Sequence, residues 1–173
     1  IKQFCLKNQF NVVMTSTKCL TGTDRVFEVS NKIKKDFYIN VQGDEPLVKT
    51  KDIINFLRFA KKHKSDVVNA YTEINNKKDY FNSNVPKLVF NNSNNLMYMS
   101  RSTIPGNKKN KFYKAYKQVC IYSFPYKYLQ KFGKMKKKSN FESIEDIEIL
   151  RFLEMGIKVK MFKVSNASIG VDT

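Results

Sequence analysis

Hydrophobic and polar positions follow two different periods along the first third of the chain, one typical of strands and one typical of helices. Short apolar runs between polar residues are typical of buried strands, whereas apolar residues that recur every three or four positions indicate helices. The clearest helical stripe is in residues 51–62, where Ile53, Leu57 and Ala60 fall on one side. The same rules predict strands at residues 11–14, 37–39 and 66–71, helices at 22–33 and 51–62, and the end of a helix at 1–8.

Further along, the pattern changes to a hairpin and then returns to helices and strands. The polar residues 91–95 separate two short apolar runs, which is typical of a turn between antiparallel strands. Gly156 follows a helical stripe and is expected to end that helix. This order predicts a single α/β domain over residues 1–173, with a mixed sheet and a hairpin insertion. We expect strands at 87–90, 96–99, 118–124 and 157–164, helices at 126–132 and 144–155, and a short helix within 75–84.

The composition is that of a globular protein with a core. The chain has 173 residues, of which 42% are hydrophobic, and such a fraction is ordinary for a folded domain. No run of about 18 apolar residues occurs, so we expect no membrane span. The first residues lack the apolar segment of a signal peptide. Because the chain has no initiating Met and ends abruptly at Thr173, we expect a fragment.

The three cysteines, Cys5, Cys19 and Cys120, are widely spaced and form no C-x-x-C pair. An odd number of cysteines without close spacing argues against a disulfide framework and against a zinc site. We therefore expect reduced thiols and a cytoplasmic protein.

The net charge of +17 allows two interpretations. One is binding to nucleic acid or to an anionic membrane. The other is a lysine-rich composition spread over solvated faces. Arginine, which base and phosphate contacts favour, occurs only four times, at Arg25, Arg58, Arg101 and Arg151. We favour the second interpretation and expect no nucleic-acid partner.

An acidic turn follows the strand expected at residues 37–39. Gly43 allows the backbone to approach another group closely, and Pro46 removes a donor and ends the strand. Asp44 and Glu45 then lie at the carboxyl end of a strand, where open α/β sheets bind their ligands. The alternative is a plain acidic turn between a strand and a helix, and this stretch taken alone would favour it.

Four segments carry a more specific signal. They are T-G-T-D-R-V at residues 21–26, V-Q-G-D-E-P at 41–46, Y-M-S-R-S-T-I-P at 98–105 and G-V-D-T at 170–173. Each is weak alone, but four in register are specific. Together they resemble the CMP-Kdo synthetases, the cytidylyltransferases that activate 3-deoxy-manno-octulosonate (Kdo), over essentially the whole chain. That family's N-terminal strand and phosphate loop have no counterpart here. The resemblance implies a Rossmann-like nucleotidyltransferase domain.

The resemblance also implies a reaction, in which the sugar's anomeric hydroxyl attacks the α-phosphorus of CTP and releases pyrophosphate, in lipopolysaccharide synthesis. Such a transfer depends on positioning and on charge neutralisation, and Mg²⁺ takes one or two carboxylates beside phosphates and waters. Asp44 and Asp172 match the family's two metal aspartates and are the expected catalytic and Mg²⁺-binding residues. By the same matching we expect nucleotide contacts from Gly22, Thr23 and Arg25, and sugar contacts from Gln42, Arg101, Gln118, Tyr122 and Glu148.

Three positions depart from the family pattern. Gln118 and Cys19 stand where the family often has His, and Ile149 replaces a Gln. These changes lead us to expect a sugar pocket that differs from that of the standard enzyme, so an amino variant of Kdo or a related 3-deoxy-ulosonic acid stands beside Kdo, the acceptor that the resemblance implies. The expected partners are CTP, this acid and a second copy of the chain in a homodimer. The alternatives are a nucleotidyltransferase for acylneuraminate or another sugar, and, less favoured, a basic nucleic-acid-binding module.

Overall fold

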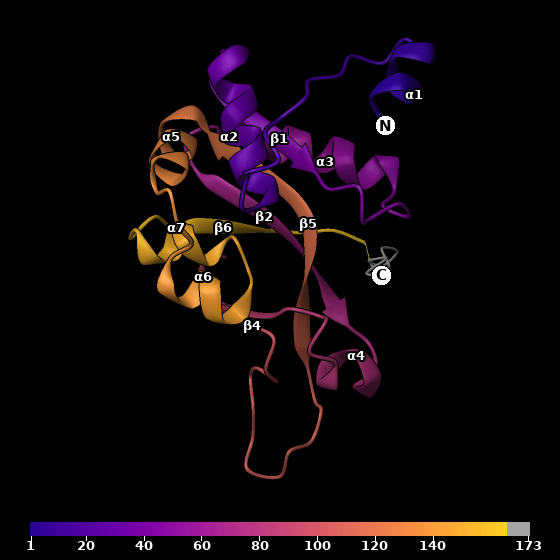
Figure 1. Ribbon diagram of the computed structural model, residues 1–173. Helices are drawn as coiled ribbons and strands as arrows, with labels where there is room; N and C mark the ends of the chain where they lie inside the picture. Colours follow the sequence, from indigo (N-terminus) through magenta and orange to yellow (C-terminus); the bar gives the residue numbers. More distant parts are fainter. Residues whose placement is uncertain (166–173) are drawn as a thin grey trace.

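Figure 1 shows the computed structural model, in which residues 1–165 are described. These residues form one six-stranded sheet with helices on both faces. In chain order the elements are α1 (Lys2–Lys7), α2 (Gly22–Lys32), β1 (Phe37–Val41), α3 (Thr50–Lys62), β2 (Val67–Ile74), α4 (Lys77–Phe81), β3 (Lys87–Phe90), β4 (Leu96–Ser100), β5 (Ala115–Pro125), α5 (Tyr126–Lys134), α6 (Asn140–Glu145), α7 (Leu150–Glu154) and β6 (Val159–Lys163).

The long strand β5 is the centre of the sheet. The strand order is β4-β3-β5-β2-β6, and β1 also pairs with β5. Because β2 occupies one edge of β5, β1 and β3 share the other edge, β1 at residues 121–125 and β3 at residues 116–117. Between them, this edge of β5 forms single backbone hydrogen bonds with Gln42 and Pro86 and one with the side chain of Glu45. β6 runs parallel to β2 while β1, β2 and β3 run antiparallel to β5, which confirms the predicted α/β fold with a mixed sheet.

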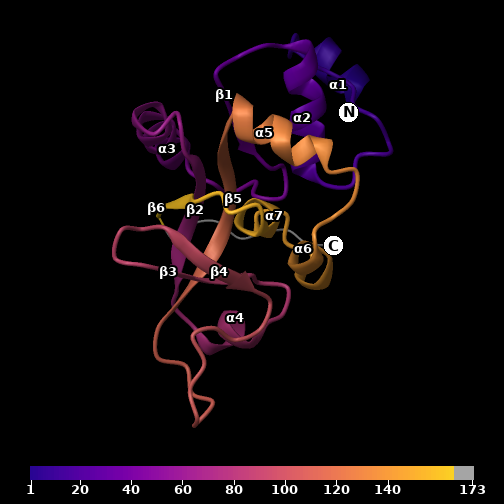
Figure 2. The same cartoon turned by 90° about the vertical axis from the view of Figure 1, so that its left-hand side faces the viewer.

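Helices cover both faces of this sheet (Figure 2). Helix α3 lies on one side, and α5, α6 and α7 lie on the other. Neighbouring strand residues point to opposite faces, and accordingly Val67 packs with Phe132 and Phe152 while Val68 packs with Phe56. Burial on both faces explains why β2 is buried along nearly its whole length. No helix within residues 1–165 is long and apolar enough to cross a membrane.

Most predicted elements are confirmed, including the hairpin and the end of the last helix. In the turn between β3 and β4, Asn94 has a φ of 55° and the Asn91 N–H donates to the carbonyl of Asn95. Gly156 has a φ of 70° and donates to the carbonyl of Leu153. Asparagine and glycine are the residues that tolerate this left-handed backbone.

The strand predicted at residues 11–14 is wrong. Val13 and Met14 are 40% and 58% exposed, and no described strand pairs with this segment. A strand needs a neighbour for its backbone groups, and here the Met14 carbonyl bonds to a side chain of α2 instead. Lys32 Nζ donates to the carbonyl of Met14, and Arg25 donates to Thr15 and Ser16 just beyond.

The helix predicted at residues 144–155 is also wrong, because it is two short helices, α6 and α7, with a break between them. Asp146 has a φ of 51°, which ends α6. Arg101 donates from Nε to the carbonyl of Glu145 and from Nη2 to the carbonyl of Asp146. A distant arginine thus binds carbonyls that a continuous helix would have used, and the break frees Glu148 from helical geometry.

Candidate active site

A pocket of about 470 Å³ opens beside the part of β5 that lies between β1 and β3. Its volume is in the range of small-molecule sites. Its walls come from the end of β1, the start of α2, the exit of β4 and the connection between α6 and α7. The pocket brings together most of the predicted site residues: Gly22, Gln42, Asp44, Arg101, Gln118, Tyr122 and Glu148.

The acidic turn after β1 puts two carboxylates at this pocket. Asp44 Oδ1 is buried and accepts no hydrogen bond within residues 1–165. Glu45 is 7% exposed, and its Oε1 accepts from the backbone N–H of Cys120 at 3.2 Å. Burial, and then the nearby carboxylates, raise the pKa of the Cys120 thiol, so the thiol stays neutral at physiological pH and is no nucleophile. The pocket therefore holds one carboxylate oxygen that still needs a partner.

That oxygen fits a cation. Buried carboxylates are costly unless they are paired or coordinate a metal, and Mg²⁺ needs only one or two of them beside phosphates and waters. Within the described part of the chain, no three His, Cys, Asp or Glu residues cluster as a metal site. Asp44 can therefore supply one ligand, and phosphate oxygens would supply others. The second expected ligand, Asp172, lies outside the described residues.

Glu148 joins the start of α2 to the end of β1. Its Oε2 accepts from the backbone N–H of Thr23 at 2.8 Å, and its Oε1 accepts from Gln42 Nε2 at 2.8 Å. Burial raises the pKa of Glu148, while these hydrogen bonds oppose that shift. Gly22 lies so close that an added Cβ would be 2.7 Å from Gln42 Nε2. The glycine thus leaves the space in which the Gln42 amide is held.

Arg101 is fixed by backbone carbonyls. Its Nε, Nη1 and Nη2 donate to the carbonyls of Glu145, Ser83 and Asp146. A guanidinium has five N–H groups, so Nη1 keeps one that no described residue uses, whereas Nη2 also pairs with the exposed carboxylate of Asp146, 4.0 Å from Oδ2. Lys87, which is fully buried, donates to the carbonyl of Arg101, and burial lowers the pKa of its amine. A carboxylate in the pocket can therefore bind to Nη1, and it can bind to both terminal nitrogens by competing with the exposed Asp146 side chain.

Gln118 and Tyr122 both come from β5, but they differ in exposure. Gln118 is half-buried at the pocket wall. Tyr122 is 2% exposed, and its ring stacks on Phe124 with the centroids 5.5 Å apart. Burial raises the pKa of the Tyr122 hydroxyl well above its usual value. Tyr122 is therefore mainly a core residue that closes the floor of the pocket.

Arg25 is separated from the other predicted residues. It is exposed and does not line the first pocket. Instead it lines a second hollow of about 620 Å³ over β1, together with Gly22, Gln42 and Gly43. Its Nη1 donates to Thr15 Oγ1 at 2.9 Å. The two hollows therefore share Gly22 and Gln42.

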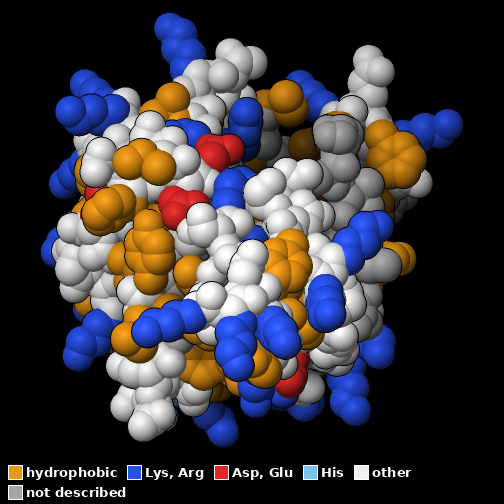
Figure 3. All heavy atoms as spheres, turned by 90° about the horizontal axis from the view of Figure 1, so that it is seen from below, with side chains coloured by type: hydrophobic (Ala, Val, Ile, Leu, Met, Phe, Trp, Pro, Cys, Tyr) orange, Lys and Arg blue, Asp and Glu red, His pale blue; other side chains and the backbone are white. Residues whose placement is uncertain are grey.

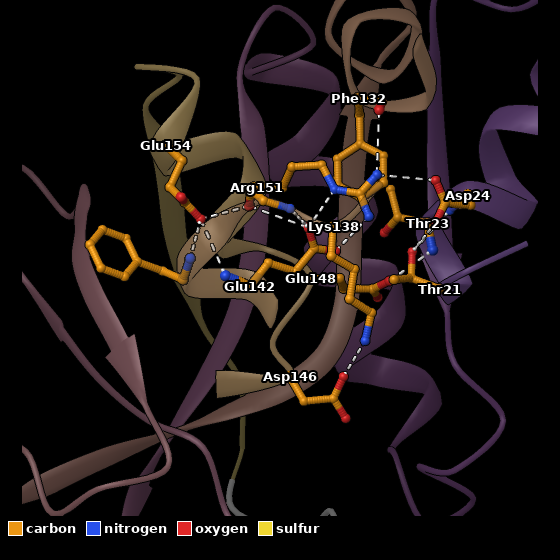
Figure 4. A network of polar contacts seen from close by, with 12 residues as sticks. Thr21, Thr23, Asp24, Phe132, Lys138, Glu142, Asp146, Glu148, Arg151 and Glu154 are labelled. Carbon is orange, nitrogen blue, oxygen red and sulfur yellow. Dashed lines mark hydrogen bonds and ion pairs between the residues drawn. The ribbon is translucent and has the colours of Figure 1, made fainter. Parts of the chain in front are cut away.

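A buried ion network behind the pocket was not predicted (Figure 4). Arg151, which is fully buried, donates from Nε and Nη2 to the two oxygens of Glu142, each at 2.6 Å, and from Nη1 to Asp24 Oδ1 at 3.2 Å. Its guanidinium lies over the ring of Phe132, 3.7 Å from the centroid. Burial disfavours the charged guanidinium and would lower the pKa of Arg151, but the bonds to Glu142 and Asp24 outweigh this effect and raise that pKa. The network ties α2 to α5, α6 and α7.

One signal in the sequence could have found part of this network. Residues 139–142 read S-N-F-E, the capping-box pattern that marks the start of a helix. In the structure Ser139 and Glu142 form that capping box, and the Glu142 Oε2 that accepts from the Ser139 N–H also accepts from Arg151 Nε. The pairing with Asp24 joins residues 127 positions apart, and nothing in the local pattern indicates it.

The comparison with known families decides the class. A family model described as cytidylyltransferase matches residues 1–160.

The chain belongs to the cytidylyltransferase family.

Individual members of this cytidylyltransferase family agree with the match. The 3-deoxy-manno-octulosonate cytidylyltransferase of Thermodesulfovibrio yellowstonii is 36% identical over 177 residues, which cover 93% of this chain and 68% of the relative. The 8-amino-3,8-dideoxy-manno-octulosonate cytidylyltransferase of Shewanella halifaxensis is 34% identical over 167 residues, 94% of this chain and 68% of the relative. The chain thus spans about two thirds of the length of these curated relatives.

A solved structure matches the fold of this cytidylyltransferase-family chain. It is a CMP:2-keto-3-deoxy-manno-octonic acid synthetase in complex with CTP, with a TM-score of 0.89 and 30% identity, and the match covers 99% of this chain and 71% of that one. The family resemblance inferred from the four motifs is therefore confirmed. The roles of the individual site residues stay predictions.

The positive charge of this cytidylyltransferase-family chain is spread out on the face shown in Figure 3. Lys and Arg side chains lie at many separate points there, with uncharged side chains between them. This distribution resembles a solvated lysine-rich surface more than one continuous groove for a nucleic-acid backbone.

Proposed function

We propose that this protein transfers CMP from CTP to a 3-deoxy-ulosonic acid, either Kdo or its 8-amino variant, with release of pyrophosphate. Both acids occur in the names of its relatives. We further propose a cytoplasmic enzyme of lipopolysaccharide synthesis; the three cysteines are unpaired.

The observation that carries this proposal is the pair of hollows that meet at Gly22 and Gln42. A transfer between two substrates needs two adjacent sites that hold the reacting atoms in contact. The hollow beside Arg25 would take the nucleotide, and the pocket beside Arg101 would take the sugar acid. The α-phosphorus would then lie near the shared wall, next to Asp44.

Each proposed role rests on a contact of the chain itself. Arg101 keeps a free N–H on Nη1, and only the exposed Asp146 carboxylate competes for Nη2, which suits binding of the acid's carboxylate. Glu148 holds the Gln42 amide beside the shared wall and holds the Thr23 N–H at the start of α2. Mg²⁺, bound by Asp44 and Asp172, would neutralise charge on the phosphates during the transfer.

The test is pyrophosphate release by the full-length protein with CTP, Mg²⁺ and a panel of acids. We expect turnover only when all three are present, with Kdo or 8-amino-Kdo preferred over acylneuraminate. The Asp44→Asn variant should lower kcat on the order of 100-fold, because a metal contributes several kcal/mol to the transition state. Asp36→Asn, an exposed carboxylate just before β1, is the matched control and should leave kcat unchanged. No release with any acid would refute the proposal.

A further inference from the structure

Asn69 is a polar residue that is completely buried at the centre of the sheet. It lies on β2, where the pairing with β5 shifts register between Asn69 and Ala70. Its Nδ2 donates to the carbonyls of Val119 and Ile121, each at 3.1 Å. Its Oδ1 accepts from Gln118 Nε2 at 3.0 Å. A buried asparagine in a core strand is costly unless its groups are bonded, and here both are used at the pocket wall.

These bonds fix which way each amide points. Backbone carbonyls only accept hydrogen bonds, so the Asn69 group that faces two of them must be the NH₂. Its oxygen must then face Gln118. Since that oxygen also only accepts, the Gln118 group beside it must be the NH₂. The Gln118 carbonyl oxygen is therefore left for the pocket, and no described residue donates to it.

We propose that Asn69 is a positioning residue that makes Gln118 present a hydrogen-bond acceptor to the sugar acid. This inference rests on the proposed function. The acceptor receives a hydroxyl or an ammonium group of the acid and disfavours its carboxylate, which belongs with Arg101. The sequence places a neutral amide here, so the contact does not titrate, unlike a histidine.

A double-mutant cycle on the full-length protein tests the positioning role. Gln118→Met keeps the length and removes the acceptor, so the KM for the acid should rise about 3- to 10-fold while the KM for CTP stays unchanged. Asn69→Leu should raise the KM for the acid several-fold in the wild type and should have no further effect in Gln118→Met. The control is Ser123→Ala. Ser123 is buried and lies on β5, as Gln118 does, and its replacement should change neither KM.

Equal effects of Asn69→Leu in both backgrounds would overturn the inference, since a merely structural role is additive. If Asn69→Leu does not fold, Asn69→Ser, which keeps one donor for the two carbonyls, replaces it in the cycle. A wild-type protein that is inactive with every acid would refute the proposed function, and this inference with it. An active wild type with additive variants would refute this inference alone.

Analogues of the acid test the polarity of the contact. Among acids that each lack one hydroxyl or amino group, one should bind the wild type about 3- to 10-fold more weakly than the parent acid. The same analogue should show no deficit in Gln118→Met. If every analogue keeps its deficit in Gln118→Met, Gln118 accepts from none of these groups, and the inference fails.

Discussion

Replacing Arg151 by Met tests the buried network that supports the pocket. The substitution keeps most of the side-chain volume and removes the only cation that Glu142 contacts among the described ion pairs. The side chains of Arg151 and Glu142 are 0% and 1% exposed, so water cannot solvate the Glu142 carboxylate in place of the guanidinium. Asp24, at 13% exposure, also loses its partner.

The expected cost follows from this burial. Breaking a buried ion pair by removing one partner costs about 3–5 kcal/mol, because an uncompensated charge stays inside. A domain of this size is stable by roughly 5–15 kcal/mol, so the variant should lose about a fifth of its stability or more. The double variant Arg151→Met with Glu142→Gln removes the orphaned charge as well. It should regain about 2 kcal/mol of the loss, since a buried amide is less costly than an unpaired carboxylate.

Equilibrium urea unfolding, followed by far-UV circular dichroism, measures these differences. Arg58→Met is the matched control, because Arg58 is exposed on α3, and it should change the free energy of unfolding by less than about 0.5 kcal/mol. The reasoning would be refuted if Arg151→Met cost less than about 1 kcal/mol, or if the double variant were no more stable than the single one.

Three further variants test two residues of the pocket wall and one that supports Arg101. Gly22→Ala should push the amide at the end of the flexible Gln42 side chain away from Glu148 and should cost about 0.5–1.5 kcal/mol, the contribution of that hydrogen bond; a gain in stability, as alanine gives in an open helix, would contradict this. Glu148→Gln places an NH₂ group where one carboxylate oxygen accepts from the Thr23 N–H or from Gln42 Nε2. Because two donors then face each other, the free energy of unfolding in urea at neutral pH should fall by about 0.5–1.5 kcal/mol. Because burial raises the folded-state pKa of Glu148, the folded state binds more protons, and wild-type stability should fall relative to this variant as pH rises above about 4.5; a stability difference that does not change with pH would show that the pKa of Glu148 is not raised. Lys87→Met should raise the KM for the sugar acid more than that for CTP, because Lys87 holds the backbone of Arg101. Equal changes in both KM values would show that Lys87 does not act on the acid through Arg101.

The sequence predicted the sheet and most helices because their signals are local. Apolar stripes, the asparagine turn and Gly156 each act within a few residues, so a single pass along the chain finds them. The break between α6 and α7 was missed because its cause is distant. Arg101 binds the carbonyls of Glu145 and Asp146, and the local stripe still indicates one helix.

The candidate site was predictable only where motifs name the residues. Family matching found Gln42, Arg101, Gln118 and Glu148, and the fold brings them to one pocket. It could not show that Arg25 faces a second hollow. The supporting residues, such as Asn69, were missed because their bonds join strands far apart in the chain and a lone polar residue in a strand gives no pattern.

The most direct test of the account is identification of the product by ³¹P NMR, after incubation of the full-length protein with CTP, Mg²⁺ and Kdo or 8-amino-Kdo. The account predicts that the CTP signals are replaced by one phosphodiester signal, of a CMP-sugar, and by pyrophosphate in equal amounts. Release of inorganic phosphate with CDP, or unchanged CTP with both acids, would contradict it.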